Sequence, residues 1–254
     1  LFTINQYPAR LLEGFVTDSR SIIVVKKTAS EKFEIIRSKA LPHNTFRIYG
    51  KSVDDIICSI ELNSPEIIKQ IHDAEIKKVQ EDNSKSLLNP AVIKNKFHID
   101  LQIPTGYEYM LHKKNFIWLK KEIISGNTSL LMYQIPLHNF QKKKDIVNSI
   151  VRMRDSIGRY IKGREPNTRM ITSEAYAPYF SKIILNIRDA FETKGTWELK
   201  NDFMAGPFIN YAIVDKTYNR LLVIEGFCYS PSNQERDLML DLEAIIKSVK
   251  IDKR

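Results

Sequence analysis

Between residues 97 and 103, apolar and polar residues alternate without exception. The apolar positions are Phe97, Ile99, Leu101 and Ile103, and the polar positions are His98, Asp100 and Gln102. Successive side chains on a strand point to opposite faces, so this pattern predicts a strand with one buried face and one solvated face. Strands of this kind are common in antiparallel sheets. We therefore expect an antiparallel sheet that rests on an apolar core.

Two later segments predict helices that cover this sheet. Their apolar residues recur every three or four positions, the spacing of one helix face. The stripes are Ile146, Ile150, Met153, Ile157 and Ile161 in the first helix, and Leu238, Leu242, Ile245 and Val249 in the second. Arg154 falls outside the first stripe. Ser232 and Glu235 have the spacing of a capping box for the second helix.

Further strands are predicted over residues 115–121, 129–135, 182–187, 195–199, 208–215 and 220–227. Strands in series with covering helices indicate an α+β module with an antiparallel sheet. The order of strands and helices resembles the αβα sandwich of PsbP-like proteins. That analogy concerns the fold and implies no function.

The first part of the chain is expected to form a second α+β module. A short helix is predicted over residues 8–15, and strands over residues 21–27, 45–49 and 55–62. Ser64 and Pro65 have the pattern of an N-cap followed by proline at the first helical position, which predicts a helix to about Gln80. We expect an N-terminal module over residues 1–80, a linker over 81–95 and a C-terminal module over 96–254.

Composition indicates a globular protein. Of 254 residues, 43% are hydrophobic and 27% are charged, and the formal net charge is +9, so anionic polymers and lipid surfaces must be considered as partners. The lysines are dispersed, which favours a solvated surface. No nucleic acid partner is expected, because the segment 115–121 has apolar residues on both faces. Cys58 and Cys228 each lie in an apolar run, which predicts two buried free thiols.

No known catalytic motif is present. The chain lacks the G-x-S-x-G, Walker, H-E-x-x-H and G-x-G-x-x-G patterns, and its five histidines show no metal-ligand spacing. We therefore predict no catalytic residue, metal or cofactor. One alternative stays open: a hydrolase acting on envelope glycan or lipid through paired carboxylates such as Asp202 and Glu225. Glycosidase chemistry would need such a pair within roughly 5–10 Å.

The most distinctive segment runs from Trp197 to Phe208. Its sequence, WELKNDFMAGPF, predicts a tight turn at residues 205–207, where Gly206 would permit a positive φ. Its aromatic residues either fill the core or line a pocket, and burial of aromatics favours the core. A second such segment, residues 225–231, ends a strand. The candidate residues for binding a ligand or partner are Trp197, Asp202, Phe203, Met204, Gly206, Phe208, Glu225 and Tyr229.

At these segments the chain resembles a family of uncharacterised Bacteroidota lipoproteins, domain of unknown function 4837. The matching pieces are FHIDLQIPTGY at 97–107, NFIWLKK at 115–121, Arg154-Asp155-Ser156, GTWELKNDFMAGPF at 195–208, EGFCYSP at 225–231 and LEAI at 242–245. Ala205 stands where this family usually has glycine. The resemblance implies export by a lipoprotein signal and a lipidated cysteine upstream of Leu1, but it implies no activity.

Three functions follow as hypotheses. The first is a non-enzymatic envelope lipoprotein, exported and anchored to the outer membrane on its periplasmic or surface side. It would bind a protein partner or a ligand through the aromatic turn or through a cleft between the modules. The second is the hydrolase described above, and the third is a binder of anionic polymers or lipid surfaces. The chain begins with Leu1 rather than Met, so we expect that an upstream segment has been removed.

Overall fold

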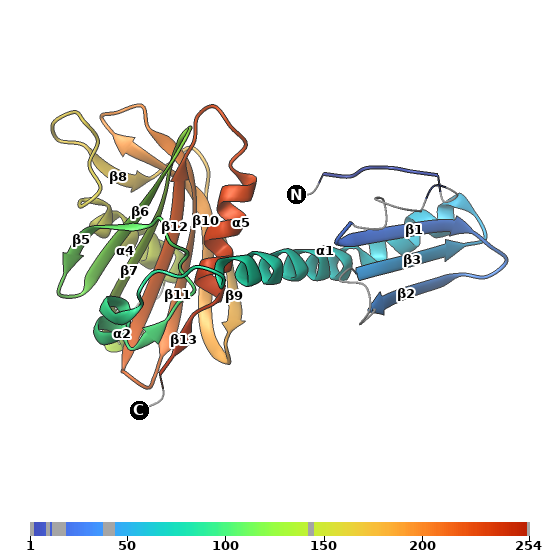
Figure 1. Ribbon diagram of the computed structural model, residues 1–254, viewed down its shortest axis with the longest axis horizontal. Coiled ribbons are helices and arrows are strands. Elements are labelled where there is room, and N and C mark those ends of the chain that lie inside the picture. Colours follow the sequence, from blue (N-terminus) through green and yellow to red (C-terminus); the bar gives the residue numbers. More distant parts are fainter. Residues whose placement is uncertain (1–2, 9–10, 12–18, 38–43, 142–144, 253–254) are drawn as a thin grey trace. The chain divides into compact units, whose positions relative to one another are not determined.

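The computed structural model describes residues 3–8, 11, 19–37, 44–141 and 145–252 (Figure 1). The chain forms two compact units, residues 1–79 and 80–254, and the boundary between them lies within helix α1 (Val53–Asn83). The helix predicted over residues 8–15 lies outside the described residues for most of its length.

The N-terminal unit contains a three-stranded sheet, β1 (Ser21–Lys27), β2 (Lys32–Arg37) and β3 (Asn44–Gly50). The central strand β3 pairs in parallel with β1 and antiparallel with β2. Phe46 and Ile48 of β3 are fully buried and pack with Ile67 of α1. The sheet therefore covers its apolar face with the helix that follows it.

The segment 55–62, predicted as a strand, is part of α1 instead. The reason is a reciprocal cap at its start. Ser52 Oγ accepts a hydrogen bond from the Asp55 backbone N–H at 3.1 Å, and Asp55 Oδ2 accepts one from the Ser52 N–H at 2.9 Å. These bonds satisfy donors that a helix start leaves open, and they outweigh the β preference of the isoleucines. Ser64 is consequently not an N-cap, and Pro65 lies inside the helix.

An antiparallel sheet of eight strands dominates the C-terminal unit (Figure 1). Its order is β5-β6-β7-β12-β11-β10-β8, and β9 also pairs with β10. The strands are β5 (Glu108–Lys113), β6 (Phe116–Ile123), β7 (Gly126–Pro136), β8 (Arg169–Thr172), β9 (Tyr179–Leu185), β10 (Arg188–Lys200), β11 (Ala205–Asp215) and β12 (Arg220–Tyr229).

Helices cover both faces of this sheet. Helices α2 (Ala91–Phe97) and α5 (Arg236–Lys247) pack on one face, and α3 (Leu137–Gln141) and α4 (Ile146–Gly158) pack on the other. The alternation along β12 separates the two cores: Leu222 packs with the α5 core, whereas Leu221 packs with the α4 core. The predicted α+β class and the helix-covered antiparallel sheet are confirmed.

The alternating segment 97–103 has the predicted burial but only a short strand. Phe97, Ile99, Leu101 and Ile103 are all at most 8% exposed. However, α2 ends at Phe97, and only β4 (Ile99–Asp100) pairs, with β13 (Lys250–Ile251). The segment therefore packs its apolar side chains into the core without joining the large sheet.

Two predicted helix boundaries differ in the structure. Helix α5 begins after Glu235, whose side chain makes no cap and instead accepts a hydrogen bond from the Ser230 backbone N–H at 3.3 Å. The predicted capping box at Ser232 is therefore wrong. Residues 81–95, predicted as a linker, contain the end of α1 and the start of α2, where Asn89 Oδ1 accepts a hydrogen bond from the Ala91 N–H at 3.0 Å.

Candidate functional site

The distinctive segment 197–208 forms a hairpin of β10 and β11. The turn is made by residues 201–204, and Asn201 adopts the left-handed conformation with φ 64°. Asparagine tolerates this conformation better than most residues, so it can replace glycine in a turn. The turn predicted at residues 205–207 is wrong, because these residues already belong to β11.

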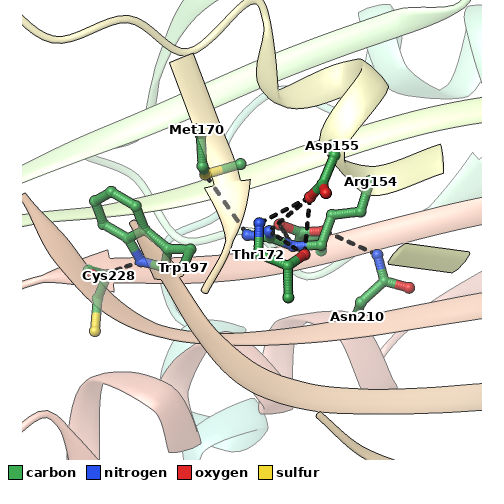
Figure 2. Close-up of polar contacts among 8 residues, drawn as sticks. Arg154, Asp155, Met170, Thr172, Trp197, Asn210 and Cys228 are labelled. Atoms are coloured by element: carbon green, nitrogen blue, oxygen red, sulfur yellow. Dashed lines mark hydrogen bonds and ion pairs between the residues drawn. The ribbon is translucent and has the colours of Figure 1, made fainter. Parts of the chain in front are cut away.

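Gly206 is required for close packing rather than for a special backbone conformation. Among the described glycines, only Gly106 and Gly126 have positive φ, so the predicted positive φ of Gly206 is wrong. A Cβ atom at Gly206 would lie 2.2 Å from the carbonyl oxygen of Cys228. That same oxygen accepts a hydrogen bond from Trp197 Nε1 at 3.1 Å (Figure 2). Because Gly206 has no side chain, strands β10, β11 and β12 can approach one another closely at this point.

The eight predicted site residues divide by exposure. Trp197, Gly206, Phe208 and Glu225 are buried, Asp202, Met204 and Tyr229 are partly buried, and Phe203 is fully exposed at 104%. Trp197 and Phe208 belong to the α4 core, so these two aromatics fill the interior. The buried residues and Phe203 therefore belong to two different environments, an internal polar network and the tip of a hairpin.

The internal network is built around an ion pair between α4 and β12. Arg154 Nε lies 2.9 Å from Glu225 Oε1, and the two side chains are 1% and 0% exposed. The Nε–H does not point at this oxygen, so the contact is an ion pair rather than a hydrogen bond. Asn210 Nδ2 donates a hydrogen bond to Glu225 Oε2 at 2.8 Å. The guanidinium carbon of Arg154 lies 3.8 Å from the centroid of the Phe208 ring.

Strand β8 closes the other side of this network. Thr172 Oγ1 accepts a hydrogen bond from Arg154 Nη1 at 3.0 Å and donates one to Asp155 Oδ1 at 2.8 Å. Asp155 Oδ1 also accepts one from the Thr172 backbone N–H at 2.8 Å (Figure 2). Three side chains thereby tie helix α4 to the edge of the sheet.

Glu225 is fully buried, and its surroundings act on its pKa in opposite directions. Burial raises the pKa of this carboxyl above its ordinary value, while Arg154 and the hydrogen bond from Asn210 oppose that shift. The Glu225 side chain has no exposed surface in this structure. Asp202 lies elsewhere, on the hairpin turn, where its Oδ1 accepts a hydrogen bond from the Phe203 backbone N–H at 2.7 Å. The two carboxylates therefore occupy unlike environments.

The pieces that carry the family resemblance meet in this network. Arg154 and Asp155 come from one piece, Trp197 and Phe208 from another, and Glu225 from a third. Periodicity placed Arg154 outside the apolar stripe, but the buried residues of α4 are Ile150, Arg154 and Gly158. The signal that could have found Arg154 is its place in a matching piece, since hydrophobic spacing cannot indicate a buried cation.

A second buried cluster joins α5 to the sheet. Tyr211 Oη lies 2.5 Å from Glu192 Oε2 and 2.9 Å from Glu243 Oε1. Lys194 Nζ lies 3.2 Å from Glu192, and Lys247 Nζ lies 2.8 Å from Glu243. The positive charges of the two lysines therefore offset the negative charges of the two carboxylates. This pair of neighbouring carboxylates was not predicted, because its members come from distant parts of the chain.

Phe203 is exposed on the β10–β11 turn. The turn, its flanking strands and the loop packed on it carry four cations, Lys162, Arg164, Arg169 and Lys200, and two carboxylates, Glu165 and Asp202; we call this region the basic tip. Arg169 and Lys200 are direct cross-strand partners. The loop that holds the other two cations packs on the turn, since Asn201 Nδ2 donates to Asn167 O at 3.5 Å and a Cβ at Gly163 would lie 2.2 Å from Asp202 Oδ2. Like charges directly opposite each other on neighbouring strands are unfavourable.

Other features of the described residues add no site. They contain no group of three or more histidine, cysteine, aspartate or glutamate side chains that could hold a metal ion. No helix in that part of the chain is both long and apolar enough to cross a membrane. Both cysteines are free: Cys228 is buried as predicted, but Cys58 is exposed on α1, so its predicted burial is wrong.

Comparison with family models identifies the C-terminal unit. Residues 86–248 match the model described as domain of unknown function (DUF4837). The chain belongs to this family. Residues 1–84 match a second model, domain of unknown function (DUF8532). The resemblance inferred from the sequence pieces is thereby confirmed for DUF4837.

No curated protein matches the chain. Among solved structures, it is similar to the Ran-binding protein Mog1p of Saccharomyces cerevisiae. The two chains share 9% identity with a TM-score of 0.38, and the match covers 61% of this chain and 91% of Mog1p.

Proposed function

We propose that this DUF4837 protein is a non-enzymatic envelope lipoprotein of a Bacteroidota species that binds a protein partner through the basic tip. The export signal, the lipid anchor on the outer membrane and the taxonomic origin rest on the resemblance of the sequence pieces quoted above. The observation that carries the binding proposal is Phe203, which exposes its whole side chain on an ordered turn.

An exposed phenylalanine of this kind is suited to act as an anchor. Aromatic side chains are enriched in protein interfaces, and a few of them supply most of the binding free energy. Moving a phenylalanine side chain from water into an apolar pocket contributes about 1.5–3 kcal/mol. The four cations outnumber the two carboxylates of the basic tip, so its net positive charge favours a partner whose pocket has an acidic rim, because complementary charge speeds encounter and fixes orientation.

Binding by full-length lipidated protein tests this function. Phe203→Ser is expected to weaken recovery of the partner from the native envelope by about 10–100-fold in affinity, which corresponds to the loss of the buried side chain. Ile184→Ser is the matched control, because Ile184 is also exposed, at 68%, but lies on β9 beside the opposite end of β10. Equal recovery by both variants would contradict the proposal.

A vesicle assay separates this function from binding to an anionic lipid surface. A protein anchor predicts no more binding to vesicles with anionic lipid than to neutral vesicles. Strong, salt-sensitive binding to anionic vesicles that is lost in Phe203→Ser would assign the basic tip to a membrane surface instead.

A further inference from the structure

A cleft of about 310 Å³ opens where β7 ends and β12 begins. Its walls also include the end of α2, the β5–β6 turn and the β11–β12 turn. The polar residues that line it are Lys96, His98, Asn115, Gln134, Asn219 and Arg220. The lining includes two cations and three amides but no carboxylate. This composition suits a ligand that carries negative charge.

Arg220 is fixed in the floor of the cleft by three different partners. Its Nε donates to Asp215 Oδ2 at 2.7 Å, its Nη1 to Gln134 Oε1 at 2.6 Å and its Nη2 to the Phe97 carbonyl oxygen at 2.6 Å. These bonds use three of the five N–H groups of a guanidinium. The orientation of the remaining two is therefore set before any ligand arrives.

Lys96 and Gln134 are also held with donors to spare. Lys96 Nζ donates to the carbonyl oxygens of Lys113 and Lys114 at 2.8 and 3.1 Å, which leaves one of its three N–H groups. The Oε1 atom of Gln134 accepts from Arg220, which orients the amide and leaves its two Nε2–H groups to donate. All three side chains therefore keep N–H groups that can donate.

The charge near the cleft is positive. Asp215 is fully buried and pairs with Arg220, but Arg188 Nε also lies 4.0 Å from Asp215 Oδ1. One carboxylate thus faces two arginines, and Lys96 adds a third cation. His98 and Tyr218 form a rigid wall, since their rings stack at 4.9 Å with an interplanar angle of 4°. His98 has a left-handed backbone, with φ 51° and ψ 48°.

We propose that this cleft binds the oxyanion group of a small molecule, a carboxylate or a phosphate, through Lys96, Gln134 and Arg220. Charge-assisted hydrogen bonds from fixed donors are the stronger kind, and preorganised side chains lose little entropy on binding. The volume of the cleft is at the lower end of the range for small-molecule sites. This site lies apart from the basic tip and does not depend on its function.

The test uses the isotope-labelled full chain and two probes, inorganic phosphate and citrate. Each is titrated while the side-chain amide resonances of Gln134 are followed by NMR, with sodium chloride at equal ionic strength as reference. Lys96→Gln removes one cation but keeps a donor, and it is expected to weaken probe binding about tenfold. Lys182→Gln is the matched control, because Lys182 is exposed on β9, and it should bind the probe as the wild type does.

Saturable shifts with phosphate alone would assign a phosphate ligand, and shifts with citrate alone would assign a carboxylate ligand. Either result, or both together, supports the site if Lys96→Gln weakens binding of the same probe. The proposal is overturned if neither probe shifts Gln134 beyond the chloride reference, or if Lys96→Gln responds like Lys182→Gln. Wild-type shifts confined to residues outside the cleft would overturn it without any variant.

Discussion

The Nε atom of Arg154 lies 2.9 Å from Oε1 of Glu225 in the interior of the C-terminal unit, where neither side chain is more than 1% exposed. Removing two charges from water is unfavourable by several kcal/mol, and their attraction offsets this only when other hydrogen bonds are also made. Here Asn210 and Thr172 supply such bonds. The pair therefore connects α4, β8, β11 and β12 in one arrangement.

Removing one member of this pair should be more harmful than removing both charges. We expect Arg154→Met to lower the free energy of unfolding by about 3–5 kcal/mol, because it leaves Glu225 buried without a counter-ion. Adding Glu225→Gln removes that charge and keeps an oxygen for Asn210, so more than half of the loss should be recovered. Urea unfolding of the single and double variants measures both values. A double variant as unstable as Arg154→Met would contradict this interpretation.

Gly206→Ala is expected to lower the free energy of unfolding by about 1–3 kcal/mol, the usual effect of overpacking. The new Cβ would meet the Cys228 carbonyl oxygen at 2.2 Å, and that atom is backbone held in β12. The neighbouring change Ala205→Gly is the control, because Ala205 is exposed. It should lower the free energy of unfolding by no more than about 1 kcal/mol. Thermal unfolding compares the two variants, and equal losses would show that Gly206 has no special packing role.

The two thiols should differ in reactivity. Burial raises the pKa of the Cys228 thiol to about 12, so it stays protonated and shielded at neutral pH. Cys58 is exposed on α1. A thiol reagent should therefore modify one cysteine of the folded protein and two after denaturation. Cys228 Sγ lies 3.7 Å from Met239 Sδ, and rapid modification of both thiols in the folded protein would be incompatible with this packing.

Alkaline pH should destabilise the fold through buried tyrosines. Burial raises the pKa of Tyr107 from 10.0 to about 12, and it also raises the pKa values of Tyr133 and Tyr211. The folded state then holds these protons more tightly than the unfolded state does. The stabilisation is complete below pH 10.0 and decreases as the pH rises from there towards 12.

Tyrosinate absorbance and urea unfolding, measured across this pH range, check the prediction. Some of the eleven tyrosines should titrate only as the protein unfolds. Tyr107→Phe should reduce the pH dependence, because its phenol contributes to it, although the change also removes a hydrogen bond to Thr128. If all tyrosines titrate together in the folded protein, their inferred burial is incorrect.

Apolar pattern predicted the C-terminal core well because it records burial directly. The stripe Leu238, Leu242, Ile245 and Val249 and the alternation from Phe97 to Ile103 both identify side chains that the core contains. The pattern could not distinguish an extended segment over the core from a strand in the large sheet. That choice depends on which backbone N–H and C=O groups form hydrogen bonds. The side chains of Phe97 to Ile103 alone do not determine this pairing.

The remaining errors have local or long-range causes. The isoleucines of residues 55–62 predict a strand, but the Ser52–Asp55 cap stabilises a helix there instead. Arg154 could not be recognised as buried, because its partner Glu225 lies far along the chain. The exposure of Phe203 was likewise beyond prediction, since the same segment buries Trp197 and Phe208.

Photo-crosslinking from position 203 in the native envelope tests the binding role of the basic tip most directly. A photoreactive phenylalanine analogue replaces Phe203 in the full-length lipidated protein, and a second protein carries it at Ile184. A discrete protein adduct should form from position 203 and weaken at high salt, and it should not form from position 184. Equal adducts from both positions, or none from position 203, would contradict the proposed partner binding.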